Sequence, residues 1–266
     1  MSSLQRRIKI GYDLLAHLWG SKSRYRIHSP LVYTFVTEVL PHKEEAVFNR
    51  IHKLRESLSQ TEDIISWEEL GAGSLHFPQA SASVKDLVRR VVRRHREGAL
   101  LYRICKHYAP TCGLELGTHL GISSIYQALG MEEGRLMSIE GVPAFARLAD
   151  KNLRDAGVEV ELRVGKFEHI LSQLAREGYH PDYIFLDGNH TYEATKAYFQ
   201  FLLPMLADGG ILVLDDIYWS GGMRRAWREI SDHPEVSVSL DLFFFGVCFI
   251  RRPQAKEHFP LRFLPF

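Results

Sequence analysis

Short apolar runs alternate with longer amphipathic stretches from about residue 113 onward. In the amphipathic stretches the apolar residues recur every three to four positions, the period of a helix that packs on one face. This alternation is typical of βαβ units with a parallel sheet. We expect strands at 113–116, 136–139, 159–164, 183–186 and 211–214, and helices near 122–130, 143–156, 167–177, 193–206 and 223–231.

Two further apolar segments close this region. Residues 236–240 (VSVSL) and 246–252 (GVCFIRR) have the pattern of strands, and the short connection between them favours antiparallel neighbours. A reversed last strand departs from the sheets of standard dinucleotide-binding proteins. The predicted fold class is therefore α/β, a Rossmann-like doubly wound sheet with a reversed last strand.

The first 110 residues lack this alternation. They predict amphipathic helices near 4–19, 31–40, 44–60 and 84–107, separated by prolines and by a stretch rich in Gly, Ser and Ala. We therefore expect a helical N-terminal cap over 1–110, a cofactor-binding domain over 111–252 and a C-terminal tail over 253–266.

The helix predicted at 84–107 is rich in arginine. Arginines between Arg89 and Arg96 would suit a phosphate group, but apolar residues at helical spacing, such as Leu87 and Val88, occupy the opposite face. An ordinary amphipathic helix with a solvated basic face explains the same pattern.

Composition and charge narrow the class of protein. Hydrophobic residues make up 45% and charged residues 24% of the chain, as in soluble globular proteins, and 33 Lys and Arg balance 32 Asp and Glu. A net charge of +1 provides no overall field for nucleic acid or an anionic membrane. The three cysteines form no CxxC pair, and there is no secretory or membrane-spanning segment. We expect a cytoplasmic protein that binds neither nucleic acid nor membrane.

A glycine-containing turn follows the first predicted strand. Residues Glu115–Gly121 lie between that strand and a helix, where backbone must turn sharply and approach a ligand closely. The GxxxG spacing differs from the GxGxxG of pyrophosphate-binding turns, which favours a cofactor without phosphates. A similar stretch, Glu69–Ser74, is not followed by a second strand that ends in an acid, so it is not expected to be the cofactor loop.

The tips of the next two strands complete the predicted cofactor site. Glu140 ends the second strand, where a carboxylate accepts hydrogen bonds from two ribose hydroxyls; the alternative is a helix-capping acid before Pro143. Gly165 and Phe167 follow the third strand, where an adenine would lie. The predicted cofactor-binding residues are Glu115, Gly117, His119, Gly121, Ser123, Glu140, Gly165, Phe167 and Asp187.

Several of these motifs together resemble a known family. The segments LELGTHLGISS, SIEG, RVGKFEHI, FLDGNHTYE and GGILVLDD, in this order, resemble the class I O-methyltransferases of the catechol type and the related macrolide and sugar O-methyltransferases. The resemblance covers residues 110–252. It implies S-adenosylmethionine as the methyl donor and a hydroxyl group of a small molecule as the acceptor, and it leaves acceptor selection to the N-terminal helices.

Three acids and a histidine follow the fourth and fifth strands. Asp187 ends the fourth strand and Asp215 and Asp216 end the fifth, and in this fold the two strands are neighbours. Oxygen ligands favour Mg²⁺, and the resembled families hold a divalent metal at the matching positions. The alternative is that Asp187 begins an Asp-Gly turn and Asp216 caps the next helix. At Asp216 the catechol-type enzymes carry an amide and the macrolide type an acid.

The catalytic residues are predicted from the same segment. His190 stands where the resembled enzymes have a Lys or His general base, and imidazoles exchange protons near neutral pH. We expect His190 and Asp187 to be catalytic. Other possibilities stay open, namely a non-catalytic protein of the same fold, a homodimer, or another acceptor such as RNA. The absence of GxGxxG disfavours NAD-dependent oxidoreductases, and the absence of a Pro-Pro-aromatic segment disfavours nucleobase methyltransferases.

Overall fold

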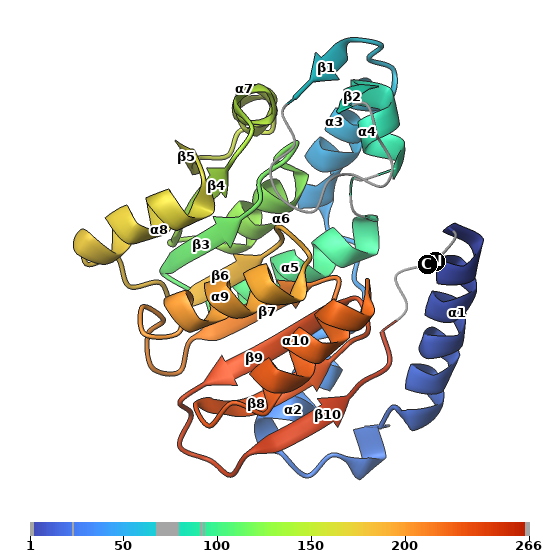
Figure 1. The fold of residues 1–266 in the computed structure, drawn as a ribbon, viewed down its shortest axis with the longest axis vertical. Helices are drawn as coiled ribbons and strands as arrows, with labels where there is room; N and C mark the ends of the chain where they lie inside the picture. The colour runs from blue at the N-terminus through green and yellow to red at the C-terminus, as the bar shows by residue number, and fades with distance from the viewer. Residues whose placement is uncertain (1–2, 23, 68–79, 91, 93, 264–266) are drawn as a thin grey trace. The chain divides into compact units, whose positions relative to one another are not determined.

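The computed structural model in Figure 1 describes residues 3–22, 24–67, 80–90, 92 and 94–263. The chain folds as two compact units. Unit 1 combines Met1–Leu40 with His180–Leu264, and unit 2 combines Pro41–Tyr179 with Pro265–Phe266. The predicted boundaries at residues 110 and 252 stay predictions. None of the helices in the described ranges is both long and apolar enough to cross a membrane.

Unit 1 contains five neighbouring strands of a β-sheet, in the order β10-β8-β9-β7-β6. Strands β6 and β7 are parallel, whereas β9 runs antiparallel to both β7 and β8. The reversed strand predicted from the sequence is thereby confirmed. The elements of this unit are α1 (Ser3–Gly20), η1 (Arg24–Arg26), α2 (Pro30–Thr34), η2 (Phe35–Val39), β6 (Tyr183–Leu186), α9 (Tyr192–Leu202), β7 (Ile211–Asp215), α10 (Gly221–Ser231), β8 (Val236–Asp241), β9 (Phe245–Ile250) and β10 (Glu257–Pro260).

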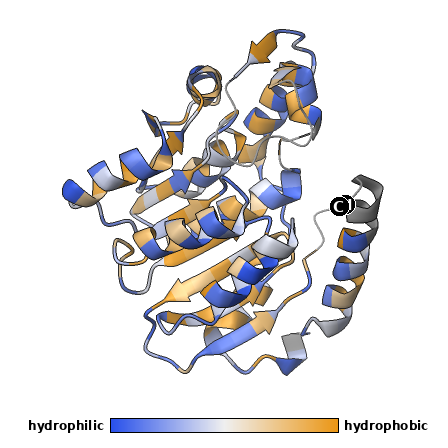
Figure 2. Cartoon of the chain, in the orientation of Figure 1, coloured by the Kyte–Doolittle hydropathy of each residue, from blue (hydrophilic) through white to orange (hydrophobic). Residues whose placement is uncertain are grey.

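The core of unit 1 lies against its strands. Every residue of β6, β7, β8 and β9 is buried, which explains the apolar runs of β6, β7 and β9, whereas β8 alternates valine with serine. In Figure 2 they are mostly orange, while α9 and α10 have one hydrophobic and one hydrophilic face. A side chain at Gly246 would collide with the ring of Trp227, so glycine permits α10 to pack closely on β9.

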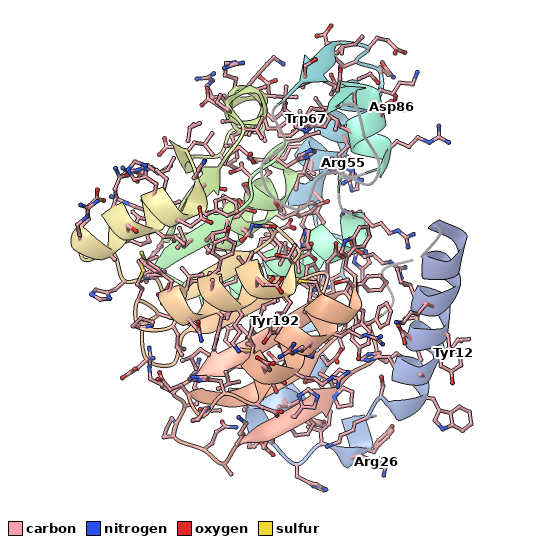
Figure 3. All side chains as sticks on the ribbon, viewed as in Figure 1. Tyr12, Arg26, Arg55, Trp67, Asp86 and Tyr192 are labelled. Atoms are coloured by element: carbon pink, nitrogen blue, oxygen red, sulfur yellow. The ribbon has the colours of Figure 1, made fainter. Side chains whose placement is uncertain are left out.

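Residues 257–260, within the predicted C-terminal tail, form strand β10. Strand β10 pairs in parallel with β8, and Phe259 and Leu261 are buried. The sequence did not predict this strand because it is short and ends at Pro260. Leu261 also accepts a hydrogen bond from the ring of His17 at 3.0 Å, which ties the first helix to the end of the chain. On the outer face of that helix Tyr12 points away from the unit (Figure 3).

Unit 2 contains the parallel strands β3, β4 and β5 in that order, with helices between them. Its elements are η3 (Ala46–Phe48), α3 (Asn49–Ser59), β1 (Ile64–Ser66), β2 (Ser81–Ser83), α4 (Val84–Arg90), α5 (His95–Tyr108), β3 (Cys112–Leu116), α6 (Ile122–Gly130), β4 (Arg135–Glu140), α7 (Pro143–Asp155), β5 (Glu161–Val164) and α8 (Phe167–Arg176). Most of these bounds lie within two residues of the predicted ones.

Two features of unit 2 differ from the prediction. The single helix expected at 84–107 is divided into α4 and α5, because Arg94 has extended backbone and its N–H group donates to the Glu97 carboxylate at 3.2 Å, which starts a new helix. The short antiparallel pair of β1 and β2 was not predicted either. In α4 Leu87 and Val88 are buried and Arg89 is exposed, as in an ordinary amphipathic helix.

Candidate functional site

The glycine-containing turn of unit 2 has the backbone that its sequence predicts. Gly117 (φ 101°) and Gly121 (φ 77°) both adopt left-handed conformations that disfavour other residues. The N–H group of Gly117 donates to the carbonyl of Ile139 at 2.9 Å, which joins the turn to β4. A Cβ atom on Gly121 would lie 3.3 Å from that of Ala149, so this glycine also lets α7 approach. The similar stretch Glu69–Ser74 lies outside the described residues.

Glu115 is directed into unit 2. Its side chain is fully buried, and its carboxylate accepts hydrogen bonds from Ser123 and Ser138 (each 2.7 Å), from Gln127 (2.7 Å) and from Ser124. Burial raises the pKa of Glu115, and these four donors oppose that shift. The arrangement favours a role of Glu115 and Ser123 in supporting the turn, and their predicted contact with a cofactor stays a prediction.

Glu140 lies at the tip of β4, beside the turn. Its carboxylate accepts from the N–H groups of His119 (2.7 Å) and Val142 (2.8 Å), and the side chain is 7% exposed. Burial raises the pKa of Glu140, and the backbone N–H groups oppose that shift. These two donors fix the carboxylate, which has further lone pairs for ribose hydroxyls. The contact with ribose hydroxyls that the sequence predicts for Glu140 stays a prediction.

The remaining predicted cofactor residues of unit 2 border the same strand ends. His119 has φ 50° and its ring lies 4.5 Å from that of Phe145, measured between centroids. The N–H group of Gly165 donates to the Glu140 carbonyl at 2.9 Å, and Phe167 is the first residue of α8. A surface cavity of about 310 Å³ lies nearby between α7 and β5, but none of the predicted cofactor residues lines it.

Replacing Glu140 tests the assignment of the cofactor site. Glu140→Ala is expected to weaken S-adenosylmethionine binding by roughly 1–3 kcal/mol, the cost of leaving charge-assisted hydrogen bonds unmade. Because burial raises the Glu140 pKa and the charged form accepts the hydroxyls, wild-type affinity should fall on acidification at a higher pH than an ordinary glutamate would dictate. Calorimetry measures both effects. The variant Glu140→Gln keeps an acceptor for the backbone N–H groups and therefore controls for misfolding. If both variants bind S-adenosylmethionine with the affinity of the wild type, the assignment is refuted.

Unit 1 brings an acid pair and a histidine together. Ligand atoms of Asp187, His190 and Asp215 all lie within 4.8 Å of one another, and His190 Nε2 is 3.5 Å from Asp187 Oδ1. The group forms because β6 and β7 are parallel neighbours, so the residues at their carboxyl ends meet at one edge of the sheet. Asp215 is 2% exposed, whereas the other two side chains are about a quarter exposed, so the group can be reached from solvent.

Asp216 does not belong to this group. Its backbone has φ 51°, and its predicted role as a metal ligand stays a prediction. It is not a helix cap either, because the side chain of Ser220 caps α10 by accepting from the Met223 N–H group at 3.0 Å. The side chain of Thr191 likewise caps α9, which begins at Tyr192, two residues after His190.

Known proteins are similar to the part of the chain that holds these groups. Residues 114–217 match the family model of a methyltransferase domain. A catechol O-methyltransferase from Niastella koreensis is 38% identical over 127 residues, which cover 46% of this chain and 55% of the relative. One from Mycobacterium tuberculosis is 32% identical over 141 residues, covering 47% and 62%. The chain thus spans between half and two thirds of the length of these curated relatives.

The fold is shared more widely than the sequence. An O-methyltransferase from Streptomyces achromogenes, solved in complex with SAM, superimposes with a TM-score of 0.56 at 22% identity and covers 87% of this chain and 100% of its own. This likeness confirms the predicted fold class. The chain therefore has the class I methyltransferase fold, its residues 114–217 match the family model of a methyltransferase domain, and over 127 residues it is similar to a catechol O-methyltransferase.

Proposed function

We propose that this protein transfers the methyl group of S-adenosylmethionine to a hydroxyl group of a small molecule, with the help of a divalent cation. The observation that carries the proposal is the group of Asp187, His190 and Asp215, whose ligand atoms lie within 4.8 Å of one another. Two further observations support it: residues 114–217 match a methyltransferase domain, and the Glu140 carboxylate beside the turn is held by the N–H groups of His119 and Val142.

The residues of the chain fit both the methyl donor and the divalent cation that the fold family implies. For the donor, the turn at Gly117 and the carboxylate of Glu140 offer close backbone approach and hydroxyl acceptors. For the cation, Asp187 and Asp215 offer carboxylate oxygens, the ligands that Mg²⁺ prefers. A bound cation would supply Lewis acidity and so make an acceptor hydroxyl easier to deprotonate.

The protein's own residues then have distinct tasks. Asp187 and Asp215 would hold the cation, and Asp187 also faces the His190 ring, with 3.5 Å between its Oδ1 atom and His190 Nε2. His190 removes the hydroxyl proton. The sulfonium donor is already activated, so alignment of the acceptor oxygen provides most of the remaining acceleration.

A direct assay tests the proposal. The purified protein with Mg²⁺ and labelled S-adenosylmethionine is expected to methylate catechol or another hydroxyl compound from a panel of small phenols and sugars, and the labelled product is identified by mass spectrometry. Donor binding without transfer to any hydroxyl acceptor would instead favour a non-catalytic protein of this fold, and transfer to RNA alone would refute the proposed acceptor class. The predicted homodimer and cytoplasmic location are separate proposals; light scattering tests the first.

A further inference from the structure

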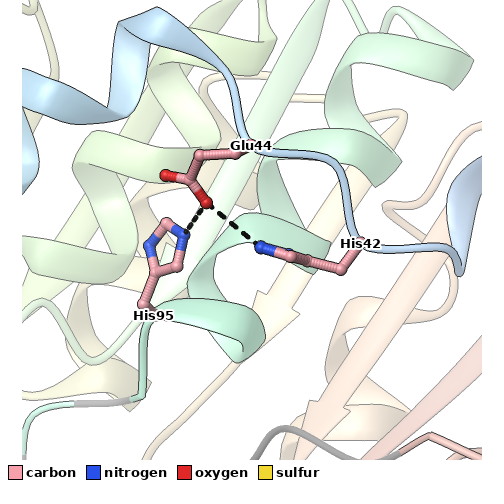
Figure 4. Close-up of side chains that lie close together, drawn as sticks. All are labelled: His42, Glu44 and His95. Atoms are coloured by element: carbon pink, nitrogen blue, oxygen red, sulfur yellow. Dashed lines mark hydrogen bonds and ion pairs between the residues drawn. The ribbon is translucent and has the colours of Figure 1, made fainter.

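A second group of metal-binding side chains lies within unit 2, and it involves none of the residues assigned above. Three histidines surround the carboxylate of Glu44. His42 and His95 place Nε2 3.1 Å from Glu44 Oε2, and His52 places Nε2 3.2 Å from Glu44 Oε1. Figure 4 shows His42 and His95 approaching the carboxylate from two sides, one from the segment before η3 and one from the first residue of α5.

The spacing of these atoms suits a shared metal ion. Ligand atoms of His42, Glu44 and His95 all lie within 4.8 Å of one another. A tetrahedral Zn²⁺ ion with bonds of about 2.0–2.1 Å needs ligand atoms roughly 3.3 Å apart. The two nitrogen–oxygen distances of 3.1 Å already approach that value, so binding requires only small rotations of the side chains.

The hydroxyl group of Tyr126 fixes the orientation of the His95 ring. Its Nδ1 atom lies 2.7 Å from the hydroxyl of Tyr126, a fully buried residue, which leaves Nε2 facing Glu44. Phe48 packs edge-on against the same ring at 5.1 Å between centroids. Metal-binding histidines characteristically have their second nitrogen held in this way, because the partner fixes the ring and its tautomer.

The site is open to solvent, and His52 lies close enough to act as a fourth ligand. Side-chain exposure is 22% for His95, 28% for His42 and 58% for Glu44, so an ion can enter without unfolding. His52, 44% exposed, stacks beside His95 at 4.5 Å and already touches the other oxygen of Glu44. A water molecule or the His52 ring would complete four-coordination.

We propose that His42, Glu44 and His95 form a Zn²⁺ site in unit 2, with His52 as the additional ligand. Mixed imidazole and carboxylate ligands favour Zn²⁺ over Mg²⁺, whose ligands are oxygens. The ion would link the segment before η3 and the neighbouring helix α3 to the start of α5, where His95 lies 51 residues after Glu44. This role is independent of methyl transfer.

Metal titration of the full-length chain tests the site. The variant Asp215→Asn is used as the background because it reduces metal binding at Asp187, His190 and Asp215 of unit 1, the acid–histidine group. Metal binding to unit 2 can then be measured separately. Calorimetry is expected to show one Zn²⁺ ion per chain, and Co²⁺ should give the visible absorption of a tetrahedral site. Zn²⁺ should also raise the Tm. In the same background, His42→Ala combined with His95→Gln should abolish all three signals, while the exposed His169→Ala serves as the matched control.

A second variant tests whether the Tyr126 hydroxyl holds the His95 ring in position for the metal. Tyr126→Phe removes only the hydroxyl, keeps the buried ring and should weaken Zn²⁺ binding by about 10–100-fold, as loss of an outer ligand partner typically does. Circular dichroism verifies that each variant is folded. Zn²⁺ affinity unchanged in the double variant, or no binding by a folded Asp215→Asn protein, would overturn the proposal and leave a cluster in which Glu44 merely accepts hydrogen bonds from histidines.

Discussion

His190→Ala is expected to lower kcat for methyl transfer by about 10²–10⁴-fold, the usual effect of removing a general base. The imidazole lies at the start of α9, 3.5 Å from the Asp187 carboxylate, where it can accept the hydroxyl proton. Steady-state kinetics at pH 7 measure the loss. At pH 9 the loss should be smaller, because hydroxide can replace the missing base.

Metal binding provides the decisive control for His190. The same imidazole belongs to the group that could hold the cation, so its removal could act through the metal instead. If His190 is the base, the Mg²⁺ concentration for half-maximal rate stays constant in His190→Ala while kcat falls. The exposed His28→Ala in the same unit should retain the wild-type rate. A wild-type rate in His190→Ala across pH 6 to 9 would exclude the base role.

Chelation is expected to remove most of the activity, and Mg²⁺ or Mn²⁺ to restore it. Asp215→Asn should raise the Mg²⁺ concentration for half-maximal rate at least about tenfold, because one charged ligand becomes neutral while the buried side chain keeps its size. Rates measured against free Mg²⁺ test this.

Asp216→Asn is the matched comparison for this metal. Since Asp216 lies outside the acid–histidine group, its amide variant should change the Mg²⁺ dependence less than Asp215→Asn does. An equal effect of both variants would add Asp216 to the ligands, as the sequence predicts. Activity indifferent to chelation, together with a silent Asp215→Asn, would exclude metal assistance.

The sequence predicted the parts of the fold that depend on local pattern. Buried strands such as β6 and β7 have continuous apolar runs, and a reversed β9 follows from the short connection after β8. Because parallel strands align their carboxyl ends, the meeting of Asp187 and Asp215 could be predicted as well. Glu140 was found for the same reason, as an acid at a strand tip.

Features that depend on tertiary contacts were not predictable. His95 lies more than fifty residues after Glu44, and no spacing in the sequence indicates that their side chains meet. The inward direction of Glu115 depends on donors such as Gln127 and Ser138, contributed by a helix and a different strand. Strand β10 needs its neighbour β8 to be recognisable at all.

The composition of unit 1 has a consequence for how the chain folds during synthesis. Apart from Pro265–Phe266, unit 2 is continuous in sequence, so all of Pro41–Tyr179 leaves the ribosome before β6 does and can fold at that stage. Helix α1 cannot form its bond from His17 to Leu261 until residue 261, 244 positions later, has been synthesised. Closing so long a loop is slow. Until then His17, which is buried in the folded unit, stands on a helix that lacks its final anchor, so the docking of α1 is a late step of folding.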